Sequence, residues 1–168
     1  MATGRPLRAV LLATLALLVL AAPAPAATIT VTTTGDTEAN DGACSLREAI
    51  VAANNDVAAG GCPEGDGADT IVLPAGTYPI EQAGAGEDGN SIGDFDIGES
   101  ATIDGAGADT TVIDGNGLDR VLHVGAGTVR IEGVTITGGR TPDGAGVVTI
   151  IGGNPVFGLS GGDAGTGG

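Results

Sequence analysis

Short runs of β-branched and other apolar residues recur along the chain, and each run is bounded by Gly, Asp, Asn or Pro. Runs of this length and composition are typical of β-strands. The 32 glycines raise disorder as an alternative, which the repeated apolar runs oppose, and no long helical periodicity follows residue 55. We therefore predict an all-β fold of many short strands joined by tight turns. The predicted strands are 28–32, 70–73, 111–113, 121–124, 129–131, 134–137 and 147–151.

One short helix is predicted after residue 44. Ser45 and Glu48 have the spacing of a capping box, in which the Ser hydroxyl and the Glu carboxylate each accept a hydrogen bond from a free backbone N–H of the first turn. Asn54 and Asn55 offer a C-terminal stop, because Asn tolerates the left-handed conformation. A helix this short is marginal alone in water, so it needs a surface to lie on. Its apolar face is formed by Leu46, Ala49, Ile50 and Ala53, at i, i+3, i+4 and i+7.

Imperfect repeats follow the helix. Gly-x-Gly-x-Asp occurs at 65–69, 105–109 and 115–119, and an Ile-Asp-Gly echo ten residues apart indicates consecutive faces within one coil of a solenoid. Val112 and Val134 begin similar runs 22 residues apart, which fits one coil of a parallel β-helix. Alternate residues should point inward. The candidate core ladders are Ile71 with Leu73, and Val134 with Ile136.

The N-terminal segment has the features of an export signal. Arg5 and Arg8 form a positive n-region, 9–22 is an apolar run too short to span a membrane, and the small residues that follow predict cleavage after Ala26. The alternative is an uncleaved N-terminal anchor. No second hydrophobic stretch follows, so we expect no transmembrane span in the mature chain and a secreted or cell-surface location.

The chain has two cysteines, Cys44 and Cys62. In an oxidising compartment we predict that they form a disulfide that holds the short helix in place. A loop of this size corresponds to about 3 kcal/mol of chain-entropy stabilisation. Two free thiols, or half of a metal site, are the alternatives.

The acidity of the chain restricts its partners. The formal net charge is −15, and removing a leader that contains Arg5 and Arg8 brings it to −17; the chain contains no Lys. We expect no nucleic-acid partner, because phosphate binding needs a basic surface. Anionic polysaccharide would also be repelled unless a cation intervened. The charge is compatible with calcium binding or a salty habitat, and solubility is the interpretation we favour.

Four residues are weak candidates for a metal site. Asp94 and Asp96 would share one face if their segment were a strand, and could then ligate Ca²⁺ or act as acid and base in glycoside hydrolysis. The favoured alternative is a solvated loop over 93–98. Asp114 and Asn116 resemble the start of an EF-hand loop, but the later ligands are missing, so a local turn is favoured. We expect no cofactor, and Ca²⁺ is the only candidate.

Other polar residues are not assigned a catalytic role. Arg120, Arg130 and Arg140 could clamp a uronate, but ten-residue spacing does not stack them on one face of a 22-residue coil, so separate surface roles are expected. His123 alternates with apolar neighbours and is expected to be packed or at the surface. We identify no catalytic constellation and expect that the chain is not an enzyme.

The chain from residue 30 to 139 resembles the N-terminal region of secreted proteins named for the Cys-Ser-Leu-Arg-Glu-Ala motif. The matching segments are 31–37, 44–50, 53–54, 61–62, 69–78, and the Ile-Asp-Gly and Val-Thr-Ile-Thr-Gly-Gly runs. The resemblance implies a right-handed parallel β-helix of the pectin-lyase-like kind on bacterial secreted or surface proteins, and it implies no defined activity.

This gives a domain plan and a functional expectation. We expect a signal peptide over 1–26, a strand, capping helix and disulfide loop over 27–68, β-helix coils over 69–151, and a Gly-rich tail, disordered or truncated, over 152–168. The helix should cover the open end of the first coil, with Arg47 on its outer face. The expected role is structural, adhesive or glycan-binding, with extracellular glycans or cell-surface components as partners. The alternatives are the N-terminal part of a polysaccharide lyase or hydrolase, and a fragment with no independent function.

Overall fold

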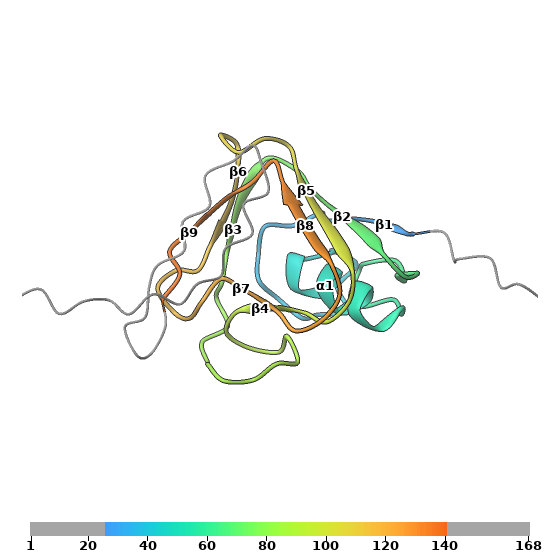
Figure 1. The fold of residues 1–168 in the computed structure, drawn as a ribbon, viewed down its shortest axis with the longest axis horizontal. Coiled ribbons are helices and arrows are strands. Elements are labelled where there is room, and N and C mark those ends of the chain that lie inside the picture. Colours follow the sequence, from blue (N-terminus) through green and yellow to red (C-terminus); the bar gives the residue numbers. More distant parts are fainter. Residues whose placement is uncertain (1–25, 141–168) are drawn as a thin grey trace, which may run out of the picture.

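The computed structural model describes residues 26–140, which form one helix and nine short strands (Figure 1). The expectation of a mostly β protein with a single helix is confirmed. Strands β3, β4 and β5 were not among the predicted strands. The elements are β1 (Thr28–Thr30), α1 (Leu46–Asn55), β2 (Asp69–Leu73), β3 (Gly76–Pro79), β4 (Phe95–Ile97), β5 (Ala101–Gly105), β6 (Thr111–Asp114), β7 (Leu122–Val124), β8 (Val129–Glu132) and β9 (Thr135–Thr137).

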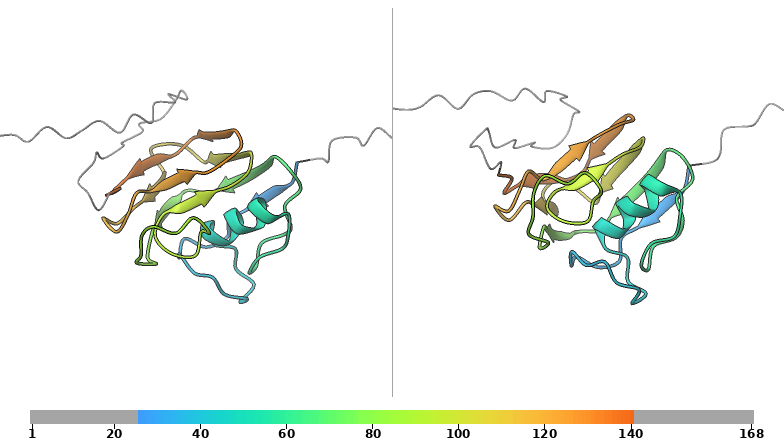
Figure 2. Two further views of the ribbon diagram at one scale, coloured as in Figure 1. Left: turned by 60° about the horizontal axis from the view of Figure 1, so that its bottom comes forward. Right: turned by 90° about the horizontal axis from the view of Figure 1, so that it is seen from below.

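The strands form three parallel sheets. Their orders are β1-β2-β5-β8, β3-β6-β9 and β4-β7, so each strand from β2 to β6 pairs with the strand three places later in the chain. Figure 1 shows the three sheets along three sides of the molecule, and Figure 2 shows successive passes of the chain stacked beside one another. A parallel connection needs a long crossover, which here runs through the other two sheets.

Apolar residues from all three sheets share one core. In the first and second sheets, buried apolar residues lie opposite one another in the parallel register, as with Ile71 and Ile103 or Ile113 and Ile136. The predicted inward positions Ile71, Leu73, Val134 and Ile136 are all buried, so this prediction is confirmed. Each fully buried Ile contributes about 1.5–3 kcal/mol of hydrophobic stabilisation.

The repeat spacing needs one correction. Val112 pairs with Thr135, not with Val134, so the offset between β6 and β9 is 23 residues and not 22. The reason is that side chains alternate between the two faces of a strand. Shifting the β6–β9 register by one residue would bring half-buried Val112 opposite Val134, which lies on the core face. The ten-residue echo does mark consecutive faces, because β5 and β6 belong to different sheets.

The start of α1 follows the prediction, and its end differs slightly. The Ser45 hydroxyl accepts from the N–H of Glu48 at 3.2 Å, and Glu48 Oε2 accepts from the N–H of Ser45 at 3.0 Å, which completes the capping box. The apolar face is buried as expected. Asn54 and Asn55 still belong to the helix, and it is Asp56 that takes the left-handed conformation, at φ 50° and ψ 44°. Asp therefore supplies the stop that was assigned to Asn.

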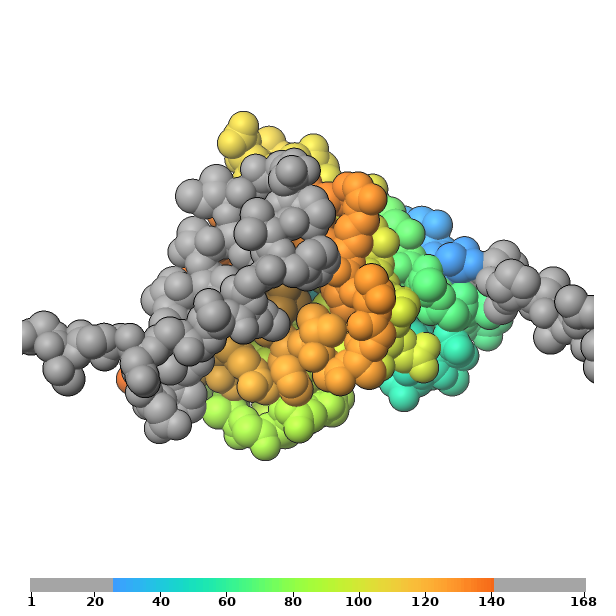
Figure 3. Space-filling view, viewed as in Figure 1, coloured from blue at the N-terminus to red at the C-terminus, as the bar shows by residue number. Residues whose placement is uncertain are grey.

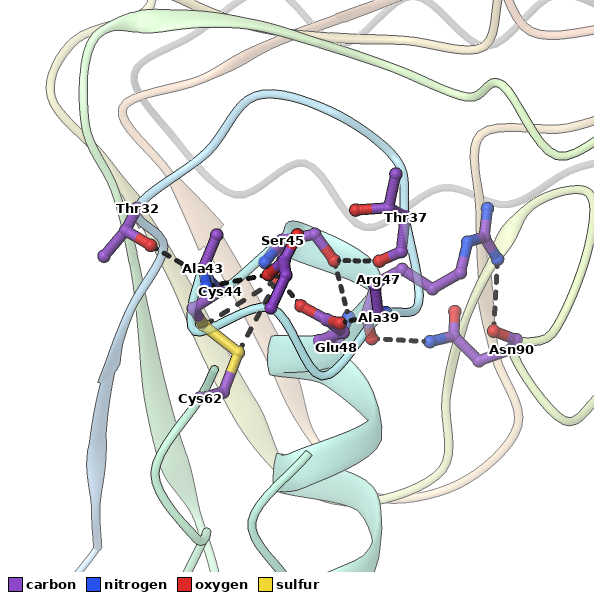
Figure 4. Close-up of a disulfide and its surroundings, with 11 residues drawn as sticks. Thr32, Thr37, Ala39, Ala43, Cys44, Ser45, Arg47, Glu48, Cys62 and Asn90 are labelled. Atoms are coloured by element: carbon purple, nitrogen blue, oxygen red, sulfur yellow. Dashed lines mark hydrogen bonds between the residues drawn. A yellow bond between two sulfur atoms is a disulfide. The ribbon is translucent and has the colours of Figure 1, made fainter. Parts of the chain in front are cut away.

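The predicted disulfide between Cys44 and Cys62 is present (Figure 4). Both cysteines are buried, and the bond joins the residue before the helix cap to the loop that follows α1. The helix is therefore held at its N-terminal end by a covalent link as well as by packing.

Several predictions concern residues beyond the described range. The predicted leader up to residue 25, the predicted strand 147–151 and the Gly-rich segment 152–168 lie outside it. Between residues 26 and 140, no helix is long and apolar enough to cross a membrane.

Candidate functional site

Arg47 lies in the interior and not on the outer face of α1, which corrects the prediction for this residue. Its side chain is fully buried and lies over the Phe95 ring, 4.8 Å from the centroid. All five guanidinium donors have partners. Two bonds go to the Asp36 carboxylate at 2.6 and 2.9 Å, and three go to the carbonyl oxygens of Asn90, Gly93 and Asp94. The helical pattern gave no signal for this burial.

The Arg47 contacts hold the loop that leads into β4. Asn90 returns a bond from its side-chain amide to the Arg47 carbonyl at 2.9 Å, as Figure 4 shows. Its Oδ1 accepts from the N–H of Asp96 at 3.0 Å, and its own N–H donates to Asp96 Oδ2 at 3.1 Å. A buried arginine thus fixes the backbone from which Asp94 and Asp96 project.

Five acidic or basic residues and His123 gather where β4 pairs with β7, and we call these six residues the charged cluster. Asp96 lies opposite His123 in the parallel register, and its Oδ1 is 2.8 Å from His123 Nδ1. Arg120 Nε donates to Asp94 Oδ2 at 2.5 Å. The members are Asp88, Asp94, Asp96, Asp119, Arg120 and His123.

Asp88 joins the charged cluster from an exposed loop, which protrudes at the bottom of the space-filling view (Figure 3). Its Oδ1 is 3.3 Å from His123 Nδ1 and 3.6 Å from Arg120 Nη2. Glu87 organises this loop by accepting hydrogen bonds from Gly89, Ser91 and Ile92. Burial alone would raise the pKa of Glu87, but these hydrogen bonds outweigh it and lower the pKa.

The interior part of the charged cluster carries unbalanced negative charge. Burial raises the pKa of Asp94, and this outweighs the hydrogen bond from Arg120. The same hydrogen bond raises the pKa of Arg120. Among the described residues, Asp94 Oδ1 and Asp119 Oδ2 are buried carboxylate oxygens without a hydrogen-bond partner. A proton, a water molecule or a cation would relieve this arrangement.

The charged cluster contains a group of possible metal ligands. Asp88, Asp96 and His123 each offer one ligand atom, and these atoms all lie within 4.8 Å of one another. One imidazole nitrogen with carboxylate oxygens is a donor set suited to divalent transition metals as well as to harder cations.

The structure separates the four metal candidates of the sequence. Asp94 and Asp96 lie in a buried strand and its approach, so the solvated-loop interpretation of 93–98 is wrong. Asp114 and Asn116 lie instead at the end of β6, where Asp114 Oδ1 accepts from the N–H of Asn116 at 2.9 Å. That local bond supports the turn interpretation for this pair.

The arginines also have different surroundings. Arg120 belongs to the charged cluster, whereas exposed Arg130 pairs with Glu132 beside it on β8. Arg140 is exposed, and its backbone N–H donates to the Asp119 carbonyl at 2.7 Å. The expected separate roles are therefore correct for Arg130, while the grouping of Arg120 and His123 with four aspartates was missed. Their sequence separation gave no signal without the β4–β7 register.

A second feature lies at the edge of β4 that faces α1. The Asn54 side chain donates from Nδ2 to the Asp96 carbonyl at 2.7 Å and accepts through Oδ1 from the Gly98 N–H at 2.8 Å. These two backbone groups flank Ile97 and are the ones that a neighbouring parallel strand would use. The amide of Asn54 thus takes the place of a peptide group on the edge of the sheet.

Comparison of the chain with protein-family models, with curated proteins and with solved structures finds no match.

Proposed function

We propose that the chain is an exported structural module, a right-handed parallel β-helix whose first layer closes one end of the stack. That layer consists of β1, α1 and the Cys44–Cys62 disulfide. The neighbouring-strand pairings and the shared inward ladders support this arrangement. The leader-like N-terminus and the disulfide support export to an oxidising compartment.

The observation that carries the proposal is the pairing of Asn54 with β4. An uncovered sheet edge presents free N–H and C=O groups that recruit other strands. In the first sheet β1 covers the edge of β2, and in the third sheet the Asn54 amide satisfies the edge of β4. Helix α1 lies at the same end of the stack (Figure 2), and its apolar face is buried. Together these contacts cover the edges of β2 and β4 at this end of the stack against edge-to-edge association.

The test uses two adjacent asparagines as a matched pair. Asn54→Ala removes both bonds to β4, whereas Asn55→Ala removes only a bond to Val51 within the helix. We expect Asn54→Ala to lower the Tm and to promote concentration-dependent oligomers in size-exclusion chromatography with light scattering, and Asn55→Ala to do neither. Identical behaviour of the two variants would overturn the proposed capping role.

The partner of such a module is proposed to be a neutral extracellular glycan or another cell-surface component. The net charge of −15 disfavours an anionic polysaccharide. The enzyme alternative, the N-terminal part of a polysaccharide lyase or hydrolase, requires carboxylates that reach the substrate. The side chains of Asp94 and Asp96 are 1% and 6% exposed, which disfavours that chemistry. Turnover of uronate-containing or neutral glycans by the purified chain would establish the alternative.

The charged cluster favours a second candidate function, the binding of a divalent cation. Three possible ligands converge, and two buried carboxylate oxygens nearby in the cluster lack partners. Isothermal titration with Zn²⁺ and with Ca²⁺ tests it. We expect binding that is lost in Asp96→Asn and kept in Asp109→Asn, whose carboxylate is exposed. If titration to millimolar cation gives no heat of binding, this second function is excluded.

A further inference from the structure

A buried carboxylate at the start of β2 lacks a cation. Asp69 is fully buried, and its Oδ1 accepts from the backbone N–H of Ala27 at 2.8 Å. The N–H of Asp66 donates to Oδ1 at 3.0 Å and to Oδ2 at 3.2 Å. Between residues 26 and 140, no Arg or His side chain forms an ion pair with it. Neutral amides alone offset the cost of burying this charge only in part.

The nitrogen that reaches Asp69 belongs to the residue directly after the predicted cleavage site. The small-residue pattern predicts hydrolysis of the bond between Ala26 and Ala27. Ala26 is exposed, whereas Ala27 is half-buried. The backbone on the C-terminal side of this bond is fixed to β2. The Ala27 carbonyl accepts from the Thr70 N–H at 2.9 Å, and Thr28 pairs with Thr70.

We propose that cleavage after Ala26 creates an α-ammonium group on Ala27 that pairs with Asp69 and locks β1 onto β2. In this step a peptidase of the export pathway adds water to the peptide bond. The hydroxyl goes to the Ala26 carbonyl carbon, the C–N bond breaks, and the Ala27 nitrogen takes up protons to become –NH₃⁺. The same atom that donated as a neutral amide then donates as a cation.

The consequence is a link between processing and final stability. A charge-assisted hydrogen bond is shorter and stronger than the neutral bond that it replaces. It also supplies the missing positive charge to a carboxylate that is already tightly enclosed, since a Cβ on Gly65 would collide with Asp69 Oδ2. The inference rests on the exported character of the proposed function, because cleavage requires export.

The test compares three forms of the chain through residue 168, released from an N-terminal fusion. One begins at Ala27, one begins at Ala26, and one begins at Ala27 with an acetylated α-amino group. Pairing raises the pKa of the α-amino group above its ordinary value of about 7.7–8.0. Its stabilisation is therefore full below the ordinary pKa and is lost as pH rises through the raised value.

At pH 6.5 we expect the Ala27 form to melt about 4–8 °C above the other two forms. The advantage should disappear at pH 11 and in the Asp69→Asn background. Because Asp69→Asn can itself impair folding, the pKa of the ¹⁵N-labelled Ala27 amino group is measured separately by NMR. Equal melting of the three forms, or an unshifted amino pKa, would overturn the ion pair.

Processing is tested by exporting the full chain in a bacterial host and sequencing the N-terminus of the product. Cleavage between Ala26 and Ala27 supports the proposal, and cleavage at any other bond overturns it while leaving export intact. A protein retained in the cell with its leader would overturn both this inference and the exported character. The Asn54 and Asn55 comparison does not depend on the N-terminus, so a failed ion pair and a failed capping role are distinguishable.

Discussion

The Arg47 guanidinium forms a two-pronged bond with the Asp36 carboxylate, from Nε to Oδ1 at 2.6 Å and from Nη2 to Oδ2 at 2.9 Å. Both side chains are buried. Asp36 Oδ2 also accepts from the backbone N–H groups of Glu81 and Gln82. This pair therefore joins three segments: the loop before the helix, the helix itself and the residues after β3.

Replacement of Arg47 should be among the most damaging changes in the described part of the chain. Arg47→Met leaves the Asp36 carboxylate buried without its cation, which we expect to lower the free energy of unfolding by about 3–5 kcal/mol in urea denaturation. Arg130→Met is the control, because Arg130 pairs with Glu132 at the surface and its loss should change stability by less than about 1 kcal/mol. An equal loss of unfolding free energy in the two variants would show that the buried pair stabilises the protein no more than the surface pair does.

The apolar face of α1 should be needed to keep the protein monomeric. Leu46→Asp or Ile50→Asp places a charge against the core, and we expect exposure of the first layer and aggregation in size-exclusion chromatography. Val57→Asp makes the same type of change at a residue that is 48% exposed and should leave the protein monomeric. Monomeric variants with unchanged melting would contradict the capping role of this face.

The disulfide should stabilise the fold by restricting the unfolded chain. Cys44 and Cys62 are 18 positions apart, and a loop of this size corresponds to about 3 kcal/mol. We expect reductant to lower the Tm of the native protein and to have no effect on the Cys44→Ala, Cys62→Ala double variant. A Tm that does not respond to reductant would show that native packing alone holds α1.

Asp94 should make stability depend on pH in a defined direction. Burial raises the pKa of this carboxyl, so the folded protein binds the proton more tightly than the unfolded chain does. Stability from this group therefore falls as pH rises from about 3.9, the ordinary value, through the raised pKa. Asp94→Asn removes that dependence, and its Tm relative to the native protein should increase over this range.

The control for this pH profile is exposed Asp109→Asn, whose Tm should follow the native profile at every pH. A difference between Asp94→Asn and the native protein that stays constant with pH would mean that Asp94 is ionised equally in the folded and unfolded states. Any difference in Tm between Asp94→Asn and the native protein that does not change with pH is the effect of losing the charged hydrogen bond to Arg120.

Much of the local structure could be predicted from neighbouring residues. The capping box at Ser45 and Glu48, the apolar helix face and the β-branched strands depend on short-range spacing. The helix features and the six predicted strands that fall within residues 26–140 are present. Strand β3 was missed because Gly76 and Pro79 are poor strand formers at its two ends. Strand β4 was missed because it has only three residues and the middle one, Asp96, is a poor strand former.

The candidate sites could be predicted only in part. Asp94 and Asp96 were identified as a pair, but their burial and their contacts with Arg120 and His123 follow from pairing between strands 27 positions apart. The offset between successive passes varies with loop length, so no fixed period in the sequence brings these residues together. The same variation placed Val112 opposite Thr135, one position from the predicted partner.

The sequence by itself determined where the helix begins and which cysteines pair. It also determined that the β-branched runs between residues 26 and 140 become strands whose alternate residues face inward, because these features depend on local spacing and side-chain type. Only the tertiary structure decided that Arg47 is buried, that Asn54 completes the edge of β4 and that the six residues of the charged cluster meet beside β7. The physical reason is that burial and pairing depend on which distant segments cover a side chain, and parallel strands are brought together by long connections of unequal length.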